Sequence, residues 1–379
     1  MLAIGLIGFL ASFSIALVLI RLRHWHGRYS YDDLENRPQK FHAHPVPRIG
    51  GIAIFTGFFF ALKLGAWSKG VALWGFGSLL LSSLPIFIGG LAEDLTKLVG
   101  PLTRISLTFI TVGLGVYLLG GRVVRLDIPA IDAILVSYPA FSLFLTFLAV
   151  GGVTNAMNIV DGYNGLCGMV SMMIFAALAY VSFQVNDPAL VAMCLAAIGA
   201  TAGYLVWNYP KGLMFAGDGG AYFLGFIIAE ISVMLVARHT EISPLFPLLL
   251  VAYPVWETVF TIYRRKFLQN RAVDSPDAMH LHQMIYKRLV RWKTGSKNPN
   301  HLIQRSSLTS PYLWGIASLS IIPAMIFWKN PHLLAISMGL FIVFYVWFYR
   351  QIVKFNCPQW LVLHSPASLP EQAISEEMQ

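Results

Sequence analysis

The stretch with the greatest potential for chemistry is NAMNIVDGYNGLCG, which runs from Asn155 to Gly168. It combines three amides (Asn155, Asn158 and Asn164), the carboxylate of Asp161 and three glycines between two apolar runs. Unpaired polar groups in lipid cost several kcal/mol each, so this stretch must lie at a membrane–water boundary or line a wet cavity between helices. A carboxylate so close to a bilayer indicates a functional site. The alternative is an ordinary turn, because Asn, Asp and Gly are turn formers.

A basic segment precedes the second apolar run. KFHAHPVPRIGG, residues 40–51, combines Lys40, His42 and Arg48 with two prolines. Cations on a stiffened turn suit an anionic headgroup or a phosphate. Positive-inside anchoring is the simpler alternative.

An acid pair follows the third apolar run. Glu93 and Asp94 are adjacent, and Lys97 lies about one helical turn further on. Two carboxylates at a membrane surface can act as a base or take part in binding Mg²⁺. A structural salt bridge with Lys97 is the alternative.

A lone carboxylate, Asp218, lies between two glycines at the start of another apolar run. An acid there could cap the helix, but it is also open to a metal that keeps water and substrate phosphates as its other ligands. Asn208 and Phe215, on the same loop, could hydrogen-bond to and stack on a nucleotide base.

Two histidines, His280 and His282, stand in a long basic loop. Their i, i+2 spacing separates them on a helix, so a zinc site is not indicated; phosphate contact or proton transfer suits the basic neighbourhood better. The alternative is an amphipathic surface helix. Glu257 lies about two turns before Arg264 and Arg265, which favours a structural role for that acid.

The elements that position these residues are membrane spans. Of 379 residues, 56% are hydrophobic and only 12% are charged, whereas about a quarter are charged in soluble domains. The net charge of +9 lies mostly in loops between apolar runs and comes with no nucleic-acid motif. The three cysteines lack metal-ligand spacing, and no disulfide is expected.

Eleven apolar runs, each near the ~20 residues that a bilayer requires, predict an all-α polytopic membrane protein with its N-terminus outside and its C-terminus in the cytoplasm. Residues 1–350 are expected to form a single catalytic domain, followed by a cytoplasmic tail over residues 351–379. The predicted spans are 1–20, 49–66, 71–90, 104–120, 133–152, 166–184, 188–206, 219–238, 244–262, 310–328 and 332–350.

The distribution of positive charge predicts the orientation. Threading the eleven spans places the tail and five loops on one side, and these segments, together with Arg350 at the start of the tail, hold 21 of the 27 Lys and Arg residues. That side is therefore predicted to be cytoplasmic. Every polar cluster described above falls on it. The five loops are 21–48, 91–104, 153–165, 207–218 and 263–309.

Carboxylates and an excess of cations on one membrane face fit a magnesium-dependent reaction between phosphates, one of them attached to a lipid. Such phosphoryl transfer depends chiefly on positioning and on charge neutralisation.

In their order along the chain, these motifs resemble those of the polyprenyl-phosphate N-acetylhexosamine-1-phosphate transferases. That superfamily includes the phospho-MurNAc-pentapeptide translocases and the enzymes that initiate bacterial O-antigen and other surface polysaccharides. NAMNIVDGYNG is similar to the signature N-x-x-N-x-x-D-G-x-D-G, and FAGDGG to F-x-G-D-x-G; the similarity covers about residues 40–300. It implies transfer of a sugar-1-phosphate from a UDP-sugar to undecaprenyl phosphate at the cytoplasmic leaflet of the bacterial inner membrane. UMP would be released, with Mg²⁺ or Mn²⁺ as cofactor.

The resemblance assigns roles to individual residues. Asp218 matches the magnesium ligand, and Asp94 matches the second acid of an Asp pair, a candidate base for the lipid phosphate. The predicted catalytic group is Glu93, Asp94, Asp161, His280 and His282. The predicted substrate-binding group is Lys40, His42, Arg48, Lys97, Asn155, Asn158, Asn164, Asn208 and Phe215.

Three positions depart from the family pattern. Glu93 stands in place of the first Asp of the pair, Asn164 in place of the second Asp of the long signature, and Gln283 where a further His is common. Asn164 keeps an acceptor but loses the charge, which argues against a metal role there. The eleven spans and the His-Leu-His form favour the surface-polysaccharide branch.

Two other functions stay open. A transporter or flippase of an anionic lipid-linked sugar would place charges near the bilayer midplane and would contain paired broken helices. A catalytically weakened relative would only bind the lipid phosphate. The sequence leaves open which sugar is carried and whether two chains form a homodimer.

Overall fold

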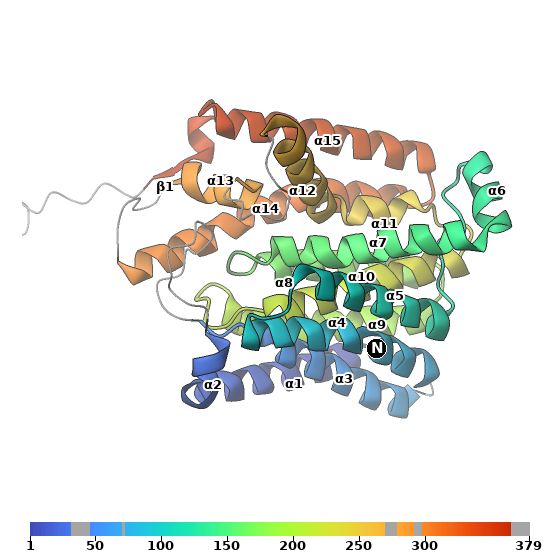
Figure 1. Cartoon of the computed structure of the whole chain (residues 1–379), viewed down its shortest axis with the longest axis horizontal. Helices are drawn as coiled ribbons and strands as arrows, with labels where there is room; N and C mark the ends of the chain where they lie inside the picture. The colour runs from blue at the N-terminus through green and yellow to red at the C-terminus, as the bar shows by residue number, and fades with distance from the viewer. Residues whose placement is uncertain (32–45, 70–72, 270–278, 292–297, 365–379) are drawn as a thin grey trace, which may run out of the picture.

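The computed structural model describes residues 1–31, 46–69, 73–269, 279–291 and 298–364. Most of the long helices lie side by side with similar axes, so that their ends gather at two opposite ends of the molecule (Figure 1). Nine helices in these ranges are long and apolar enough to cross a membrane. They are α1 (Leu2–Arg21), α4 (Leu73–Thr96), α5 (Pro101–Leu119), α7 (Pro139–Val160), α8 (Leu166–Gln184), α9 (Pro188–Asn208), α10 (Gly217–Arg238), α14 (Pro299–Phe327) and α15 (Pro331–Val353).

The all-α polytopic fold is thus confirmed, whereas the count of eleven spans and the orientation stay predictions. A further apolar helix, α3 (Gly50–Lys69), occupies the predicted span 49–66, with Gly50–Leu64 as its shorter apolar part. The predicted span 133–152 is interrupted: α6 (Pro129–Ser137) ends just before α7 begins. The proline at the start of α7 disfavours helical geometry at the residue before it.

The predicted span 244–262 is wrong as a single helix. The structure has two helices there, α11 (Leu245–Leu250) and α12 (Ala252–Tyr263). Pro254 has no N–H to bond to the Leu250 carbonyl, and its ring crowds that turn, which favours a break at this point. After the break, α12 runs at a steep angle to its neighbours (Figure 1).

The predicted loops are shorter than expected because several polar residues are satisfied within helices. The loop 153–165 is wrong in its first half, where α7 continues to Val160. The Asn155 amide donates to the Gly151 carbonyl at 2.8 Å, which lets the helix extend beyond the apolar run.

The predicted loop 263–309 is likewise wrong over much of its length. The helix α14 begins at Pro299 because Arg305, Ser306 and Ser307 are buried within the protein. The short elements of the chain are α2 (Arg23–Ser30), the π-helix η1 (Arg264–Leu268), α13 (Leu281–Arg288), β1 (Val290–Arg291), the 3₁₀ helix η2 (Gln359–Leu361) and β2 (Leu363–His364). The strand β2 pairs with β1 in parallel and brings the predicted tail onto α13.

The start of α10 is held between α3 and α4 by direct backbone contact. A Cβ added to Gly51 would lie 2.4 Å from the nitrogen of Gly220, and one added to Gly90 would lie 2.6 Å from the Cα of Gly219. Side chains at these two positions would push α10 away. Its first turn is therefore fixed relative to α3 and α4.

We predict that Gly90→Ala destabilises the fold by about 1–3 kcal/mol, because the methyl group meets backbone that cannot rotate away. Gly77→Ala on the same helix is the matched control, since a Cβ there meets nothing within 4 Å. Thermal unfolding in detergent measures both variants. Equal unfolding midpoints would contradict the proposed contact between α4 and α10.

Candidate active site

Asp94 fastens the end of α4 to the start of α10. Its carboxylate accepts the backbone N–H groups of Asp218 at 2.9 Å and Gly219 at 3.0 Å. The residue is only 1% exposed. The first N–H groups of a helix lack partners within it, and a negative charge there is stabilising. Asp94 therefore caps α10 from another helix.

The residue before Asp218 must be a glycine. Gly217 has a φ of +72°, in the left-handed region. A Cβ there would lie 2.0 Å from the Arg48 carbonyl oxygen and 2.4 Å from Oδ2 of Asp94. This turn is what aims the Asp218 side chain away from Asp94.

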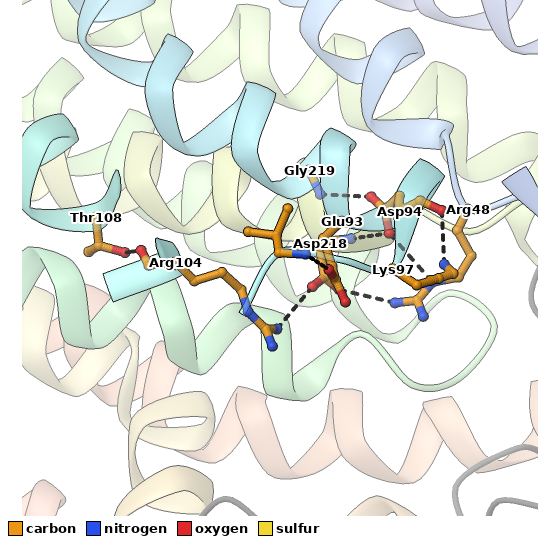
Figure 2. Close-up of polar contacts among 9 residues, drawn as sticks. Arg48, Glu93, Asp94, Lys97, Arg104, Thr108, Asp218 and Gly219 are labelled. Carbon is orange, nitrogen blue, oxygen red and sulfur yellow. Dashed lines mark hydrogen bonds and ion pairs between the residues drawn. The ribbon is translucent and has the colours of Figure 1, made fainter. Parts of the chain in front are cut away.

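The Asp218 carboxylate lies between two arginines (Figure 2). Arg48 donates from Nη2 to Oδ1 at 3.1 Å, and Arg104 donates from Nη1 to Oδ2 at 3.4 Å. The Nε of Arg48 also lies 3.6 Å from Oδ1 of Asp94. Arg48 comes just before α3 and Arg104 lies on α5, so four segments meet at this cluster.

Asp161 completes the acidic group from the end of α7. Burial raises the pKa of Asp161 to about 7; the charge of Arg48 and the Gly217 N–H lower this pKa, and the charge of Asp218 raises it. All of these groups belong to the cluster around Asp218. Asp94, Asp161 and Asp218 thus lie in one cluster, whereas Glu93, the fourth acid predicted on this face, accepts the Val99 N–H.

The two histidines lie beside this acidic group. The rings of His280 and His282 stack with centroids 5.2 Å apart, and His282 contacts Tyr163 edge-on at 5.4 Å. A Cβ added to Gly162 would lie 3.5 Å from Nε2 of His282. The start of α13 thus packs on the turn that follows Asp161.

The side chains that could act as metal ligands can be compared with those that the predicted Mg²⁺ requires. Within the described ranges, no group of three or more His, Cys, Asp or Glu side chains could hold an ion by itself. Asp218 and Asp161 form a pair of neighbouring carboxylates beside two arginines. This set fits Mg²⁺, which is usually held by one or two carboxylates and completed by water and substrate phosphates.

Comparison with known proteins links this site to a family. Residues 76–236 match the model of Glycosyl transferase family 4. The chain is 27% identical over 266 residues to a probable undecaprenyl-phosphate N-acetylglucosaminyl 1-phosphate transferase of Bacillus subtilis, covering 67% of this chain and 69% of that relative. It is 29% identical over 284 residues to a decaprenyl-phosphate N-acetylglucosaminephosphotransferase of Mycobacterium tuberculosis, covering 66% and 67%. An undecaprenyl-phosphate alpha-N-acetylglucosaminyl 1-phosphate transferase of Escherichia coli is 28% identical over 259 residues, covering 66% and 67%.

The chain is similar to the polyprenyl-phosphate N-acetylhexosamine-1-phosphate transferases. The family match runs from α4 to α10 and includes Asp94, Asp161 and Asp218. The segments carrying Arg48 and the histidines lie outside it.

Three residues predicted to contact substrate are buried in this protein. Asn208 accepts the Gly165 N–H at 2.6 Å and donates to the Met214 carbonyl at 2.7 Å. Asn164 donates to the Pro210 carbonyl at 2.9 Å and is 2% exposed, and Phe215 is 5% exposed. Asn164 and Asn208 hold the loops around the site together. The predicted contact of Asn208 and Phe215 with a nucleotide, and of Asn164 with substrate, stays a prediction.

The remaining predicted residues keep their assignments as predictions. Glu93 accepts the Val99 N–H at 2.8 Å, and Lys97 donates to the Asp94 carbonyl at 2.8 Å, so both shape the turn after α4. Asn158 is half-buried on the last turn of α7. Lys40 and His42 lie outside the described residues.

The protein also has a site residue that sequence reasoning missed, Arg104. It follows the predicted acid pair by about ten positions and comes just inside the next helix. Its location on the predicted cytoplasmic side was the available signal. Without a structure, nothing distinguished Arg104 from the other basic residues there.

We predict that Asn208, in the loop before α10, contributes to stability, and that Asn158, in the long signature, contributes to activity. Asn208→Ala should lower the free energy of unfolding by about 1–3 kcal/mol, because a buried N–H and a buried carbonyl lose their partners. Asn158→Ala, at a half-buried position, should leave the unfolding midpoint nearly unchanged and reduce activity. Thermal unfolding and turnover assays separate the two. A stable but inactive Asn208→Ala would support its predicted role in substrate binding.

Proposed function

We propose that the protein transfers an N-acetylhexosamine-1-phosphate from a UDP-sugar to undecaprenyl phosphate at the cytoplasmic face of the membrane. The observation that supports this most directly is Asp218, fixed on the first turn of α10 between Arg48 and Arg104 and beside Asp161. A diphosphate donor and a lipid phosphate together carry several negative charges. A site that pairs carboxylates with arginines can bind both a divalent cation and phosphate oxygens.

In the proposed reaction, an oxygen of the lipid phosphate attacks the β-phosphorus of the UDP-sugar. The bond between that phosphorus and the bridging oxygen breaks, and the oxygen leaves with its electron pair as part of UMP. The product is a diphosphate that links the sugar to the lipid. This balance holds whether transfer is direct or proceeds through a covalent intermediate.

The residues of this chain have distinct parts in the proposal. Asp218, with Asp161, would hold Mg²⁺, which when bound neutralises charge on the diphosphate. Arg48 and Arg104 would bind phosphate oxygens, since guanidinium groups match them in a bidentate manner. Asp94 acts through α10: both of its oxygens accept helix N–H groups and it is buried, so the geometry favours positioning over the predicted role as base.

The printed names of the bacterial relatives suggest the first donor to test. Those in Bacillus subtilis and Escherichia coli are described as N-acetylglucosaminyl 1-phosphate transferases on undecaprenyl phosphate. We therefore propose UDP-N-acetylglucosamine as the donor and the first step of a lipid-linked cell-envelope glycan as the role.

Exchange of radiolabelled UMP into UDP-N-acetylglucosamine tests the reaction. We expect exchange by the purified protein with undecaprenyl phosphate present, its loss with EDTA, and its return with added Mg²⁺. Absence of exchange with every UDP-N-acetylhexosamine, or exchange that persists in EDTA, would contradict the proposal. Movement of a lipid-linked sugar across vesicles without exchange would favour a flippase.

We further predict that Asp218→Asn lowers exchange by at least about 100-fold. The site would lose the negative charge that binds the divalent cation, and with it the stabilisation of the transition state. The fold should persist, since the amide oxygen can still accept from one arginine and Asp94 still accepts the first N–H groups of α10. Asp127→Asn is the matched control; that acid is paired with Arg125, away from the site. Near-normal exchange by Asp218→Asn would refute its role as a metal ligand.

A further inference from the structure

Glu257 is a buried acid on α12 whose carboxylate contacts two other helices. Its Oε1 accepts from Nδ1 of His280 at 3.0 Å and from the N–H of Leu281 at 3.1 Å. Its Oε2 accepts the hydroxyl of Tyr345, on α15, at 2.6 Å. Glu257 itself is 1% exposed. Glu257 thus contacts the start of α13 and α15, which fits the structural role predicted for this acid.

These contacts fix the helix that carries the histidines. Leu281 is the first residue of α13, and its N–H has no partner within that helix. A carboxylate at this position satisfies the N–H and interacts favourably with the helix dipole. Glu257 therefore holds α13 at the residue that follows His280.

The same carboxylate selects the proton position on His280. An ionised carboxylate can only accept hydrogen bonds, so the 3.0 Å contact with Glu257 favours the His280 tautomer that carries the proton on Nδ1. The His280 side chain also accepts the Gln283 N–H as part of the cap of α13. Thr261, one turn further along α12, lies 3.2 Å from the same nitrogen. The ring is thereby held with Nε2 turned away from Glu257. It stacks on His282, which packs against Gly162 beside Asp161.

Two tyrosines of α15 support this arrangement. Tyr345 satisfies the second oxygen of Glu257, and Tyr349 donates to the carbonyl of Met279, the residue before His280, at 3.0 Å. The start of α13 is therefore held from α12 and from α15. Both helices lie outside the part of the chain that matches the family model.

We infer that Glu257 is a positioning residue for the transfer reaction, held by Tyr345 and acting through His280. Its carboxylate sets the tautomer and orientation of the imidazole at the edge of the acidic cluster. The inference rests on the proposed function only for its kinetic effect. The contact itself can be tested without turnover.

Kinetics of three variants test the effect. Glu257→Ala should lower kcat about 10- to 100-fold, as is typical when the partner that orients a functional histidine is removed. The KM for the sugar donor should change much less than kcat. Glu257→Gln should recover most of the loss, because its amide oxygen still accepts from His280 and Leu281. Tyr345→Phe should have a smaller effect than Glu257→Ala.

Tyr312→Phe is the matched control. Its hydroxyl donates to the Leu361 carbonyl at 2.7 Å, a bond of the same kind at a position away from Glu257. Its kcat should equal that of the unaltered protein. Wild-type kcat in Glu257→Ala would overturn the inference. If Glu257→Ala fails to fold, wild-type kcat in Tyr345→Phe, together with an unchanged His280 tautomer in that variant, would do so.

A double-mutant cycle tests whether Glu257 acts through the histidine. Adding Glu257→Ala to His280→Ala should cost no more activity than His280→Ala alone, because residues that share one function are not additive. Multiplicative losses would overturn the proposed route through His280.

Nitrogen NMR of ¹⁵N-histidine-labelled protein provides the readout that needs no turnover. Comparison with His280→Ala identifies the His280 signals. We expect a protonated Nδ1 in the unaltered protein and a changed tautomer population in Glu257→Ala. An unchanged spectrum would overturn the positioning inference even if exchange is observed. The expected spectrum without any exchange would refute the proposed function alone.

Discussion

The hydrogen bonds from the N–H groups of Asp218 and Gly219 to the Asp94 carboxylate are the contact on which the site depends. Between membrane helices, apolar contact supplies little driving force because lipid is equally apolar. Helix positions are then set by close packing and by polar contacts. At this end of the molecule both act together: glycines let α3 and α4 touch the backbone of α10, and Asp94 binds its first N–H groups. The position of the Asp218 carboxylate follows from this.

The charges around Asp218 are arranged so that the site can exchange partners. Arg48 and Arg104 are each about one quarter exposed, whereas the carboxylates that they contact are largely buried. A guanidinium that pairs with a carboxylate in the absence of ligand can pair with a phosphate in its presence, because both anions offer two oxygens to the planar fork of the guanidinium. Asp94 cannot exchange in this way, since its N–H partners are fixed in the backbone. The two acids therefore differ in what they can do, although they lie in one cluster.

The acidic cluster could be predicted from the sequence because the evidence for it, the position of each acid relative to the apolar runs, does not depend on how the helices pack. Asp94, Asp161 and Asp218 all follow or precede apolar runs, and the alternation of spans places them on one side. The sequence does not reveal the structural part played by Asn164 and Asn208, because an amide that ties two loops together has the same composition as one that binds a ligand. Only the structure shows that the hydrogen bonds of Asn208 end on Gly165 and Met214. The break at Pro254 was missed because the apolar run continues through it.

The break between α11 and α12 also affects which groups Glu257 contacts. A continuous span would align residue 257 with the neighbouring helices, where a buried acid would need a partner inside the membrane. Because the helix ends at Leu250 and restarts at a steep angle, the face of α12 that carries Glu257 meets the start of α13 and the side of α15. The acid is then satisfied by an N–H, an imidazole and a phenol, all from later parts of the chain. The helix break before Pro254 thus contributes to the position of the histidine pair relative to the acidic cluster.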